Sequence, residues 1–393
     1  MYIVEWLYWL RQIMKRIKKY ILKLLNIVCY RLYRMSGKRE SILEKVDEEL
    51  IFRSWTKNNS HCYIQSRDEW SNHPELDLSI IVPLYNSEQF IHRNVDSLLA
   101  QKTYFKYEII LVNDGSKDST QRIVEKYRDE NLEKIVAISQ DNGGISCARN
   151  IGIANSKGGY ISFVDQDDWV SEDYVEKMIS TAYAKQADIV KAGFCDIYTN
   201  RIRNRECNSC VAYDGMKDRL FCYKSYVYPG VYRRELFEHI QFPVGYWYED
   251  MIIRSLVFRQ AKVFVHIPNV LYFKRFHSSN SSFTIWDVKN NKSIEHLYLS
   301  MDIIEVNDLL NLPRDIWLYE CLMREYGFIL SLRIRYLEEN IKKNVFLKAC
   351  DILSELYKDE YYEELSDENR EWQSIFANRE YKMWKLKCGH YFV

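Results

Sequence analysis

The sequence lacks any long uninterrupted run of apolar residues. After Leu10 a lysine or arginine recurs about once per turn of the N-terminal segment, so no stretch reaches the roughly 18–20 apolar residues that a membrane-spanning helix needs. It also lacks a small-residue cleavage site after an apolar N-terminal core, and it contains no internal repeat and no low-complexity tract. These absences favour a folded cytoplasmic protein over a membrane-spanning, secreted or repeat protein.

The ten cysteines lack the second tight Cys-x-x-Cys pair that is typical of a four-thiolate zinc site. Cys207 and Cys210 form one such pair, and Cys195 and Cys222 flank it at equal spacings. Four thiolates at these positions could bind zinc, whereas free thiols in a reducing compartment are the simpler interpretation. Both interpretations stay open at this point.

Ordinary globular composition accompanies an uneven charge distribution. The chain has 393 residues, 47% hydrophobic and 28% charged, which is typical of a folded protein with more than one domain. The formal net charge is zero, yet residues 1–40 carry ten lysines and arginines against two glutamates, so the remainder is net acidic. A basic N-terminal arm with its own task is therefore expected.

Residues 1–35 are predicted to form a basic amphipathic helix. Apolar side chains such as Ile3, Leu10 and Ile17 recur at spacings of three and four, and lysines occupy the opposite face. Tryptophan and tyrosine beside cationic residues suit the headgroup region of an anionic leaflet, so we expect peripheral contact with the inner face of the cell membrane. The alternative is a helix that docks on the protein's own second domain.

The rest of the chain divides by its pattern into three parts. Residues 36–77 are mixed and polar and are predicted to be a connector. Residues 78–285 alternate short apolar runs with helical patterns, which predicts an α/β domain with a doubly wound, mostly parallel sheet and helices on both faces. Residues 286–393 show long helical patterns and are predicted to form a helical C-terminal domain.

Polar residues gather where the predicted strands end. The strands over 78–82, 107–112, 135–138 and 160–164 run into Pro83–Asn86, Asn113–Ser116, Asn142–Asn150 and Asp165–Trp169. Ligands of a doubly wound sheet bind beyond the carboxyl ends of its strands, so these segments are predicted to converge on one site.

The cluster Asp165-Gln166-Asp167-Asp168 is the chemically most informative segment. Neighbouring carboxylates repel one another unless a cation neutralises them, and Mg²⁺ or Mn²⁺ typically binds such carboxylates together with substrate phosphates. A bound cation can accept the charge of a departing nucleoside diphosphate. The alternative is a solvated acidic turn or a helix cap.

Two further segments offer partners for a nucleotide. Asp114 could accept the imide N–H of uracil, with Tyr85 as a ring face, although Asn-Asp-Gly-Ser is also an ordinary turn sequence. Gly143 and Gly144 could let the backbone approach a ligand, and Arg149 could place a cation near phosphate. The pattern is neither a P-loop nor a dinucleotide fingerprint.

A later pair of acids and a basic run complete the candidate site. Glu249 and Asp250 precede a predicted helix over 251–260, where Asp250 could act as a general base or simply cap the helix. After the predicted strand over 263–273, Arg275 suits a diphosphate clamp, and His277 suits a third metal ligand or a hydrogen-bond donor.

Taken in order, these segments resemble the bacterial family-2 glycosyltransferases of the GT-A fold. The resemblance rests on Ser79–Asn86, Asn113–Ser116, Asn142–Asn150, Asp165–Trp169, Tyr232–Leu236 and Glu249–Asp250, and it covers roughly residues 78–285. It implies an inverting, nucleotide-sugar-dependent transfer, usually from a UDP-sugar, with Mg²⁺ or Mn²⁺ as cofactor. Pro229–Val231 and His277 depart from the residues that are common in the family at these places.

The resemblance assigns roles to the candidate residues. Asp250 is the expected catalytic base, and Asp165, Asp167 and His277 are the expected metal ligands. The expected donor-binding residues are Pro83, Tyr85, Asn86, Asp114, Gly144, Arg149, Asp165 and Arg275.

The predicted function is therefore transfer of a hexosyl or N-acetylhexosaminyl unit to a polysaccharide or lipid-linked acceptor, with no nucleic-acid partner. A nucleotidyltransferase is an alternative, but it would carry a glycine-rich loop with a lysine or arginine after the first strand, where this chain has Pro83–Asn86. A non-catalytic scaffold subunit on the same fold is a second alternative.

Overall fold

The computed structural model describes residues 21, 24–37, 40–41, 44–54, 61–65, 67, 70, 74–198, 201–205, 211–213, 226–277, 280 and 291–389. The chain forms two compact units. One unit, the sheet unit, comprises Asn58–Ile285 with Asp302–Pro313, and the other, the helical unit, comprises Met1–Lys57, Trp286–Met301 and Arg314–Val393. The predicted domain boundaries at residues 35, 77 and 285 stay predictions.

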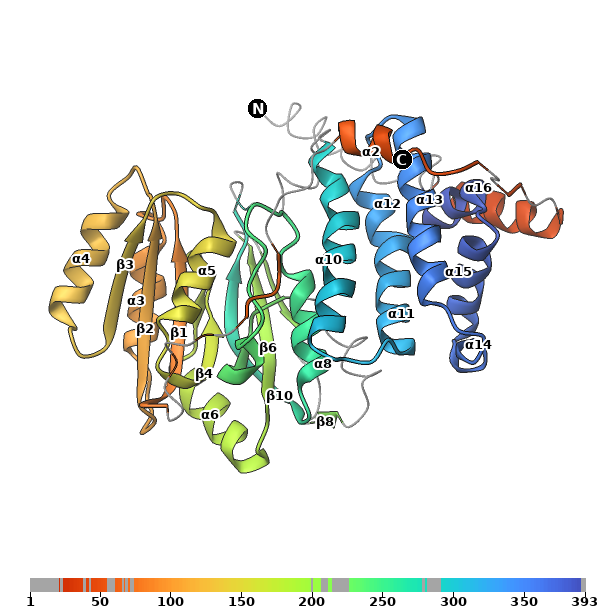
Figure 1. Ribbon diagram of the computed structural model, residues 1–393. Helices are drawn as coiled ribbons and strands as arrows, with labels where there is room; N and C mark the ends of the chain where they lie inside the picture. The colour runs from red at the N-terminus through yellow and green to blue at the C-terminus, as the bar shows by residue number, and fades with distance from the viewer. Residues whose placement is uncertain are drawn as a thin grey trace, which may run out of the picture. The chain divides into compact units, whose positions relative to one another are not determined.

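The sheet unit is built on one mixed sheet of ten strands (Figure 1). Eight strands follow one another in the order β3-β2-β1-β4-β9-β6-β10-β5, while β7 pairs with β6 and β8 pairs with β10. The strands are β1 (Leu76–Leu84), β2 (Tyr107–Asp114), β3 (Ile135–Gln140), β4 (Gly158–Phe163), β5 (Trp169–Val170), β6 (Ile189–Tyr198), β7 (Arg201–Arg205), β8 (Val211–Tyr213), β9 (Gly230–Arg233) and β10 (Phe264–Arg275).

The first four strands confirm the predicted parallel core. β1 pairs in parallel with β2 and β4, and β2 pairs in parallel with β3. All residues of β2 are buried, as are those of β1 from Leu78 onward. Continuous apolar runs of this kind are typical of strands covered on both faces, which is why they are recognisable in the sequence. Their carboxyl ends meet at one edge of the sheet.

Helices between the strands cover this core: α3 (Ile91–Leu99), α4 (Thr120–Glu130), α5 (Ile145–Ala154) and α6 (Tyr174–Lys185). Three short helical segments follow later: the 3₁₀-helix η1 (Arg234–Phe237), the π-helix η2 (Ile253–Val257) and the α-helix α8 (Phe258–Gln260). Helix α5 approaches β1 closely at Gly152, where a Cβ atom would lie 2.4 Å from Cγ2 of Ile81. Only glycine allows this approach, which seats the start of α5 at the edge where β1 and β2 end.

Antiparallel strands are the part of the sheet that the sequence patterns do not reveal. β9 lies antiparallel between β4 and β6, so these two strands are not neighbours. β6 and β10 are parallel, but their register shifts between Ile267 and Val270, a stretch that contains Pro268. Proline has no N–H for a ladder hydrogen bond, which accounts for an irregularity there. The prediction of a mostly parallel sheet therefore holds for the core and not for its second half.

The helical unit confirms the predicted helical C-terminal region. Its elements are α2 (Glu48–Ser54), η3 (Asn291–Ile294), the first part of α10 (Glu295–Leu309), α11 (Ile316–Arg324), η4 (Glu325–Ile329), α12 (Leu330–Arg333), α13 (Glu339–Leu356), α14 (Tyr361–Glu364), α15 (Asp367–Ala377) and α16 (Tyr381–Cys388). Asp315 caps α11 by accepting the Leu318 N–H at 3.0 Å, and Gly389 ends α16 in the left-handed conformation. These local signals place the helix ends.

The predicted N-terminal amphipathic helix lies mostly outside the described residues. Residues 24–35 are helical. Leu24, Val28 and Leu32, at successive spacings of four, are 46%, 49% and 60% exposed, so an apolar stripe faces outward. None of the helices in the described ranges is both long and apolar enough to cross a membrane.

Among the predicted zinc ligands only Cys195 lies in the described part of the chain. It is buried on β6. Cys207, Cys210 and Cys222 lie outside the described residues, so the choice between zinc ligands and free thiols stays open.

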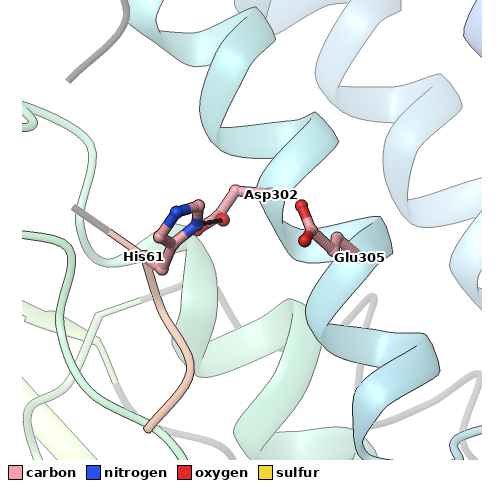
Figure 2. A group of neighbouring side chains, drawn as sticks. All are labelled: His61, Asp302 and Glu305. Atoms are coloured by element: carbon pink, nitrogen blue, oxygen red, sulfur yellow. Dashed lines mark hydrogen bonds and ion pairs between the residues drawn. The ribbon is translucent and has the colours of Figure 1, made fainter. Parts of the chain in front are cut away.

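The segment before β1 is attached to the sheet unit by Asp302 of α10 (Figure 2). One carboxylate oxygen of Asp302 lies 2.9 Å from His61 Nδ1, and the other accepts the Cys62 N–H at 2.9 Å. Glu305 lies beside them, with a carboxylate oxygen within 4.8 Å of a ring nitrogen of His61 and of a carboxylate oxygen of Asp302. Because both oxygens of the buried Asp302 already have protein partners, this group acts as an anchor for residues 61–65.

Candidate active site at the carboxyl edge of the sheet

The acidic loop after β4 is held from two sides. Asn94 on α3 donates through Nδ2 to the backbone oxygens of Asp165 and Asp168, at 2.9 and 3.0 Å. The carboxylate of Asp168, which is 2% exposed, accepts the Tyr272 hydroxyl at 2.7 Å and the Arg275 N–H at 2.8 Å. Asp168 therefore holds the loop in place through contacts within the protein. Asp165 and Asp167 are the acids of the loop that remain candidates for ligand binding.

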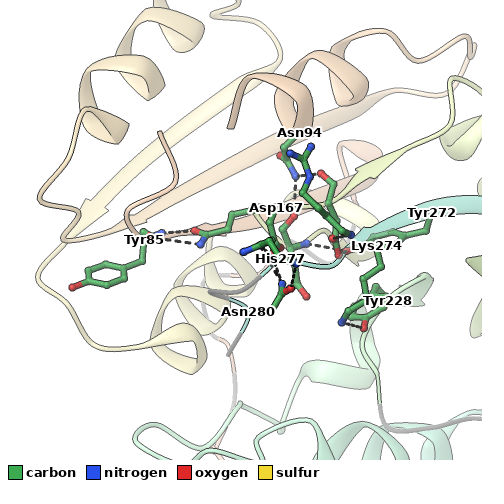
Figure 3. A network of polar contacts seen from close by, with 12 residues as sticks. Tyr85, Asn94, Asp167, Tyr228, Tyr272, Lys274, His277 and Asn280 are labelled. Carbon is green, nitrogen blue, oxygen red and sulfur yellow. Dashed lines mark hydrogen bonds and ion pairs between the residues drawn. The ribbon is translucent and has the colours of Figure 1, made fainter. Parts of the chain in front are cut away.

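Asp167 and His277 come together at this loop although 110 positions separate them (Figure 3). His277 Nε2 lies 2.8 Å from Asp167 Oδ2, which also accepts a hydrogen bond from Asn280 Nδ2 at 2.8 Å. The imidazole stacks on Phe90 with ring centroids 4.6 Å apart. Burial, and then the neighbouring Asp165, raise the pKa of the Asp167 carboxyl. Two predicted metal ligands thus share one corner of the site.

A second cluster joins the acidic loop to the predicted base, and we call Arg149, Asp165, Glu249 and Asp250 the Arg149 cluster. Arg149 Nη1 lies 2.9 Å from Glu249 Oε1 and 3.2 Å from Asp250 Oδ1, and Nη2 lies 3.2 Å from Asp165 Oδ1. Arg149 is 2% exposed, whereas the Asp250 side chain is 32% exposed. One buried guanidinium therefore binds three carboxylates from two distant segments.

Burial, and to a lesser extent neighbouring carboxylates, raise the pKa of several acids at this edge. Burial raises the pKa of Glu249 to about 8, and Asp250 adds to the shift. Burial also raises the pKa of Asp250, while Arg149 opposes that shift. In Asp168, burial and then Asp167 raise the pKa well above its ordinary value. A cation near these carboxylates would offset both the burial and their mutual repulsion.

A different arrangement surrounds Asp114, and we call Asp114, Gln140, Gly143 and Gly144 the Asp114 turn. Asp114 Oδ1 accepts the Gly143 N–H at 2.8 Å and Gln140 Nε2 at 2.5 Å, and Oδ2 accepts the Gly144 N–H at 2.8 Å. Gly144 has φ 85° and directly precedes α5. The predicted uracil acceptor is thus 3% exposed and already holds the loop that leads into α5.

The residues after β1 form the outer rim of the edge. Gln166 joins the acidic loop to Tyr85, because its side chain accepts the Tyr85 N–H at 2.6 Å and donates to the Tyr85 carbonyl at 3.2 Å. The Tyr85 ring is 44% exposed and extends away from Asp167 and His277 (Figure 3). Pro83 is buried in β1, and Asn86 adopts φ 48°. A surface pocket opens beside this rim, lined by Asn86, Glu88, Gln89, Phe90, Lys117 and Asp118.

The predicted diphosphate clamp sits among aromatic rings. The Arg275 guanidinium carbon lies 5.2 Å from the centre of Trp169 and 5.3 Å from that of Phe90. A second guanidinium, that of Arg93, lies 3.5 Å from the Trp169 ring centre. Arg275 therefore stands next to the acidic loop, within cation–π distance of two aromatic rings, and its guanidinium suits a donor to phosphate.

Sequence reasoning did not find the residues that hold the site from behind. Asn94 was detectable, because it is a polar residue on the helix face that carries Ile91, Val95 and Leu98, and a buried amide there must have partners. Asn280 offered no such signal, since only the folded chain brings it to Asp167.

Comparisons with known proteins agree with this geometry. Residues 79–244 match the sequence profile described as glycosyl transferase family 2. Glycosyltransferase GlyA of Streptococcus pneumoniae is 30% identical over 227 residues, which are 54% of this chain and 32% of GlyA. The uncharacterized glycosyltransferase EpsJ of Bacillus subtilis is 38% identical over 212 residues, 50% of this chain and 60% of EpsJ. The chain thus spans less than two thirds of the length of these two relatives.

Among solved structures, residues 1–349 of S. aureus TarS in complex with UDP-GlcNAc match with a TM-score of 0.63 at 18% identity, over 80% of this chain and 90% of that chain. At this identity the likeness concerns the fold, and it confirms the predicted GT-A-type architecture. Residues 79–244 are thus similar to the family-2 glycosyltransferases, and the chain has a GT-A-type α/β fold.

Proposed function

We propose that the protein transfers a hexosyl or N-acetylhexosaminyl unit from a UDP-sugar to a hydroxyl of a polysaccharide or lipid-linked oligosaccharide in cell-surface glycan synthesis. The observation that carries the proposal is the Arg149 cluster, in which an acid of the predicted donor site, Asp165, and the predicted base, Asp250, bind the same guanidinium. Chemistry on a nucleotide sugar needs both sides within one site. The UDP-GlcNAc in the TarS structure supports a UDP-linked donor.

The donor set supports Mg²⁺ or Mn²⁺ as cofactor. Asp165, Asp167 and His277 would hold the ion, with oxygen ligands in the majority as these hard cations prefer. When bound, such an ion supplies positive charge to a departing nucleoside diphosphate. Arg275, which lies beside the acidic loop near Trp169, would add a guanidinium for the same phosphates.

The base would act from the opposite side of the donor. Asp250 is 32% exposed, whereas Glu249 is 11% exposed, so Asp250 is the member of the pair that an acceptor hydroxyl can reach. Its carboxylate would take the hydroxyl proton as the acceptor oxygen attacks the anomeric carbon. One in-line displacement of this kind inverts the anomeric configuration.

A donor panel tests this function. The purified protein is titrated calorimetrically with UDP, GDP and CMP sugars in the presence of Mn²⁺, and slow hydrolysis of each donor is followed. Binding and hydrolysis of one UDP-sugar are the expected results. Release of pyrophosphate from a nucleoside triphosphate instead would indicate the nucleotidyltransferase alternative, and binding of no nucleotide would leave the scaffold alternative.

We also propose that residues 24–35 rest on the inner surface of the cell membrane. The outward stripe of Leu24, Val28 and Leu32 and the basic composition of residues 1–40 support contact with an anionic leaflet. The test is cosedimentation with vesicles that contain phosphatidylglycerol. Replacing Val28 and Leu32 by glutamate should release the protein. Leu132→Glu, which changes a leucine that is 72% exposed far along the chain, is the matched control.

A further inference from the structure

The surroundings of Arg149 differ from those of a phosphate ligand. Its guanidinium is 2% exposed, and both terminal nitrogens bind carboxylates. Burial alone would lower the pKa of Arg149, but Asp250, Asp165 and Glu249 together raise it above its ordinary value. Because the guanidinium is buried and each of its two terminal nitrogens already has a carboxylate partner, we infer that its task lies within the protein.

The residue that follows Arg149 holds the same distant segment. Asn150 Nδ2 donates to the Phe242 carbonyl at 2.8 Å, and Asn150 Oδ1 accepts the Phe242 N–H at 2.8 Å. The Arg149 guanidinium carbon lies 5.1 Å from the centre of the Phe242 ring. Two adjacent residues of α5 thus attach both ends of the segment 242–250, one through its backbone and one through its acids.

Helix α5 is itself attached to the nucleotide side of the edge. Gly144 stands directly before its first residue, and the Gly144 N–H binds Asp114. At the same time Arg149 reaches Asp165 in the acidic loop. A continuous set of contacts therefore runs from the Asp114 turn through α5 to Asp250.

From this geometry we propose that Arg149 is a positioning residue, which sets the distance and orientation of Asp250 relative to Asp165, and that it is not a ligand of the donor. The proposal rests on the proposed function, because it assigns Asp250 as the base. Its physical basis is the planar guanidinium, which binds several carboxylates in fixed directions. A lysine ammonium keeps the charge but cannot reproduce this fork.

Arg149→Lys tests the proposal through the split between catalysis and binding. We expect kcat for transfer to fall on the order of 10²-fold, because a small displacement of a reacting group has that effect. The donor Kd, measured by calorimetry, should stay within about threefold of the wild-type value, since no donor contact is lost. A large rise in Kd with unchanged kcat would overturn the proposal and restore Arg149 as a donor ligand.

Arg259→Lys is the matched control, since Arg259 is also a buried arginine, at 6% exposure, and donates to Asn307 and the Pro313 carbonyl, away from the Arg149 cluster. It should lower thermal stability without lowering kcat in the folded protein. If Arg149→Lys folds poorly, Glu249→Gln removes the negative charge of one of the three partners with nearly unchanged shape and should lower kcat in the same direction. An unchanged kcat in Glu249→Gln would count against the proposal.

Hydrogen–deuterium exchange separates this proposal from the proposed function. In Arg149→Lys the amides of 242–250 should exchange faster than in the wild type, because their attachment to α5 is weakened. Exchange needs no nucleotide, so it gives an answer even if the wild-type protein binds no UDP-sugar. Unchanged exchange in 242–250 would overturn the positioning role, whereas faster exchange without nucleotide binding would refute only the proposed function.

Discussion

The Asp114 turn and the Arg149 cluster both place carboxylates at the carboxyl edge of the sheet, yet they satisfy them in opposite ways. Asp114 accepts two backbone N–H groups and a glutamine amide, all from the segment 140–144. Asp165, Glu249 and Asp250 share a single guanidinium. The first arrangement stabilises a loop. The second keeps unbalanced negative charge, as a site for a cation and a proton requires.

Removing the charge of Asp250 should have the largest effect in this comparison. Asp250→Asn keeps the shape of the side chain but cannot take a proton, so transfer should fall about 10²- to 10⁴-fold. Donor affinity should change little, because Asp250, as the catalytic base, would contact the acceptor hydroxyl and not the nucleotide. Steady-state kinetics and calorimetry measure the two quantities. Turnover at the wild-type rate would show that the Arg149 cluster does not hold the base.

Removal of the metal should have the second-largest effect on transfer, through the ligands of the acidic loop. EDTA is expected to abolish transfer, and Mn²⁺ or Mg²⁺ in excess to restore it, because Asp165, Asp167 and His277 would lose their shared cation. His277→Ala should raise the metal concentration needed for half-maximal activity. Activity that chelation leaves unchanged would contradict the assignment of these residues as ligands.

Asp114→Asn should have a smaller effect of a different kind. The amide nitrogen cannot accept the Gly143 or Gly144 N–H, so a buried donor is left unpaired at a cost of about 1–3 kcal/mol in the free energy of unfolding. Urea denaturation measures this loss. If Asp114→Asn is as stable as the wild type and loses only donor affinity, the contrast between the two clusters fails. Asp114 would then bind the nucleobase of the donor and would not stabilise the loop.

The smallest effect concerns Lys191, whose burial lowers its pKa from the ordinary value of 10.5 to about 7. Between these two pH values the unfolded chain binds more protons than the folded chain, so the free energy of unfolding should rise as the pH rises from 7 toward 10.5. Lys191→Met should lack this slope. Equal slopes in pH-dependent denaturation of the two proteins would refute the lowered pKa.

The predictable part of the fold was the part with regular patterns. β1 to β4 are short buried runs separated by helices, so their places and the meeting of their ends followed from periodicity. β9 escaped notice because it is short and lies among irregular residues, and only its pairing with β4 and β6 makes it a strand. The site followed the same division, since the residues at strand ends were found and those that support them were not.

Sequence alone determined which chemistry is present: acids and glycines after the strands, a second acidic pair, a basic run, and an order of motifs that resembles the family-2 glycosyltransferases. Tertiary structure decided which partner each acid has. In the folded chain Asp114 accepts the backbone N–H groups of Gly143 and Gly144. Asp250 binds Arg149, which lies 101 positions away in the sequence. The physical reason is that a strand end depends on local pattern, whereas the choice of counterion depends on which distant segment the sheet brings within reach.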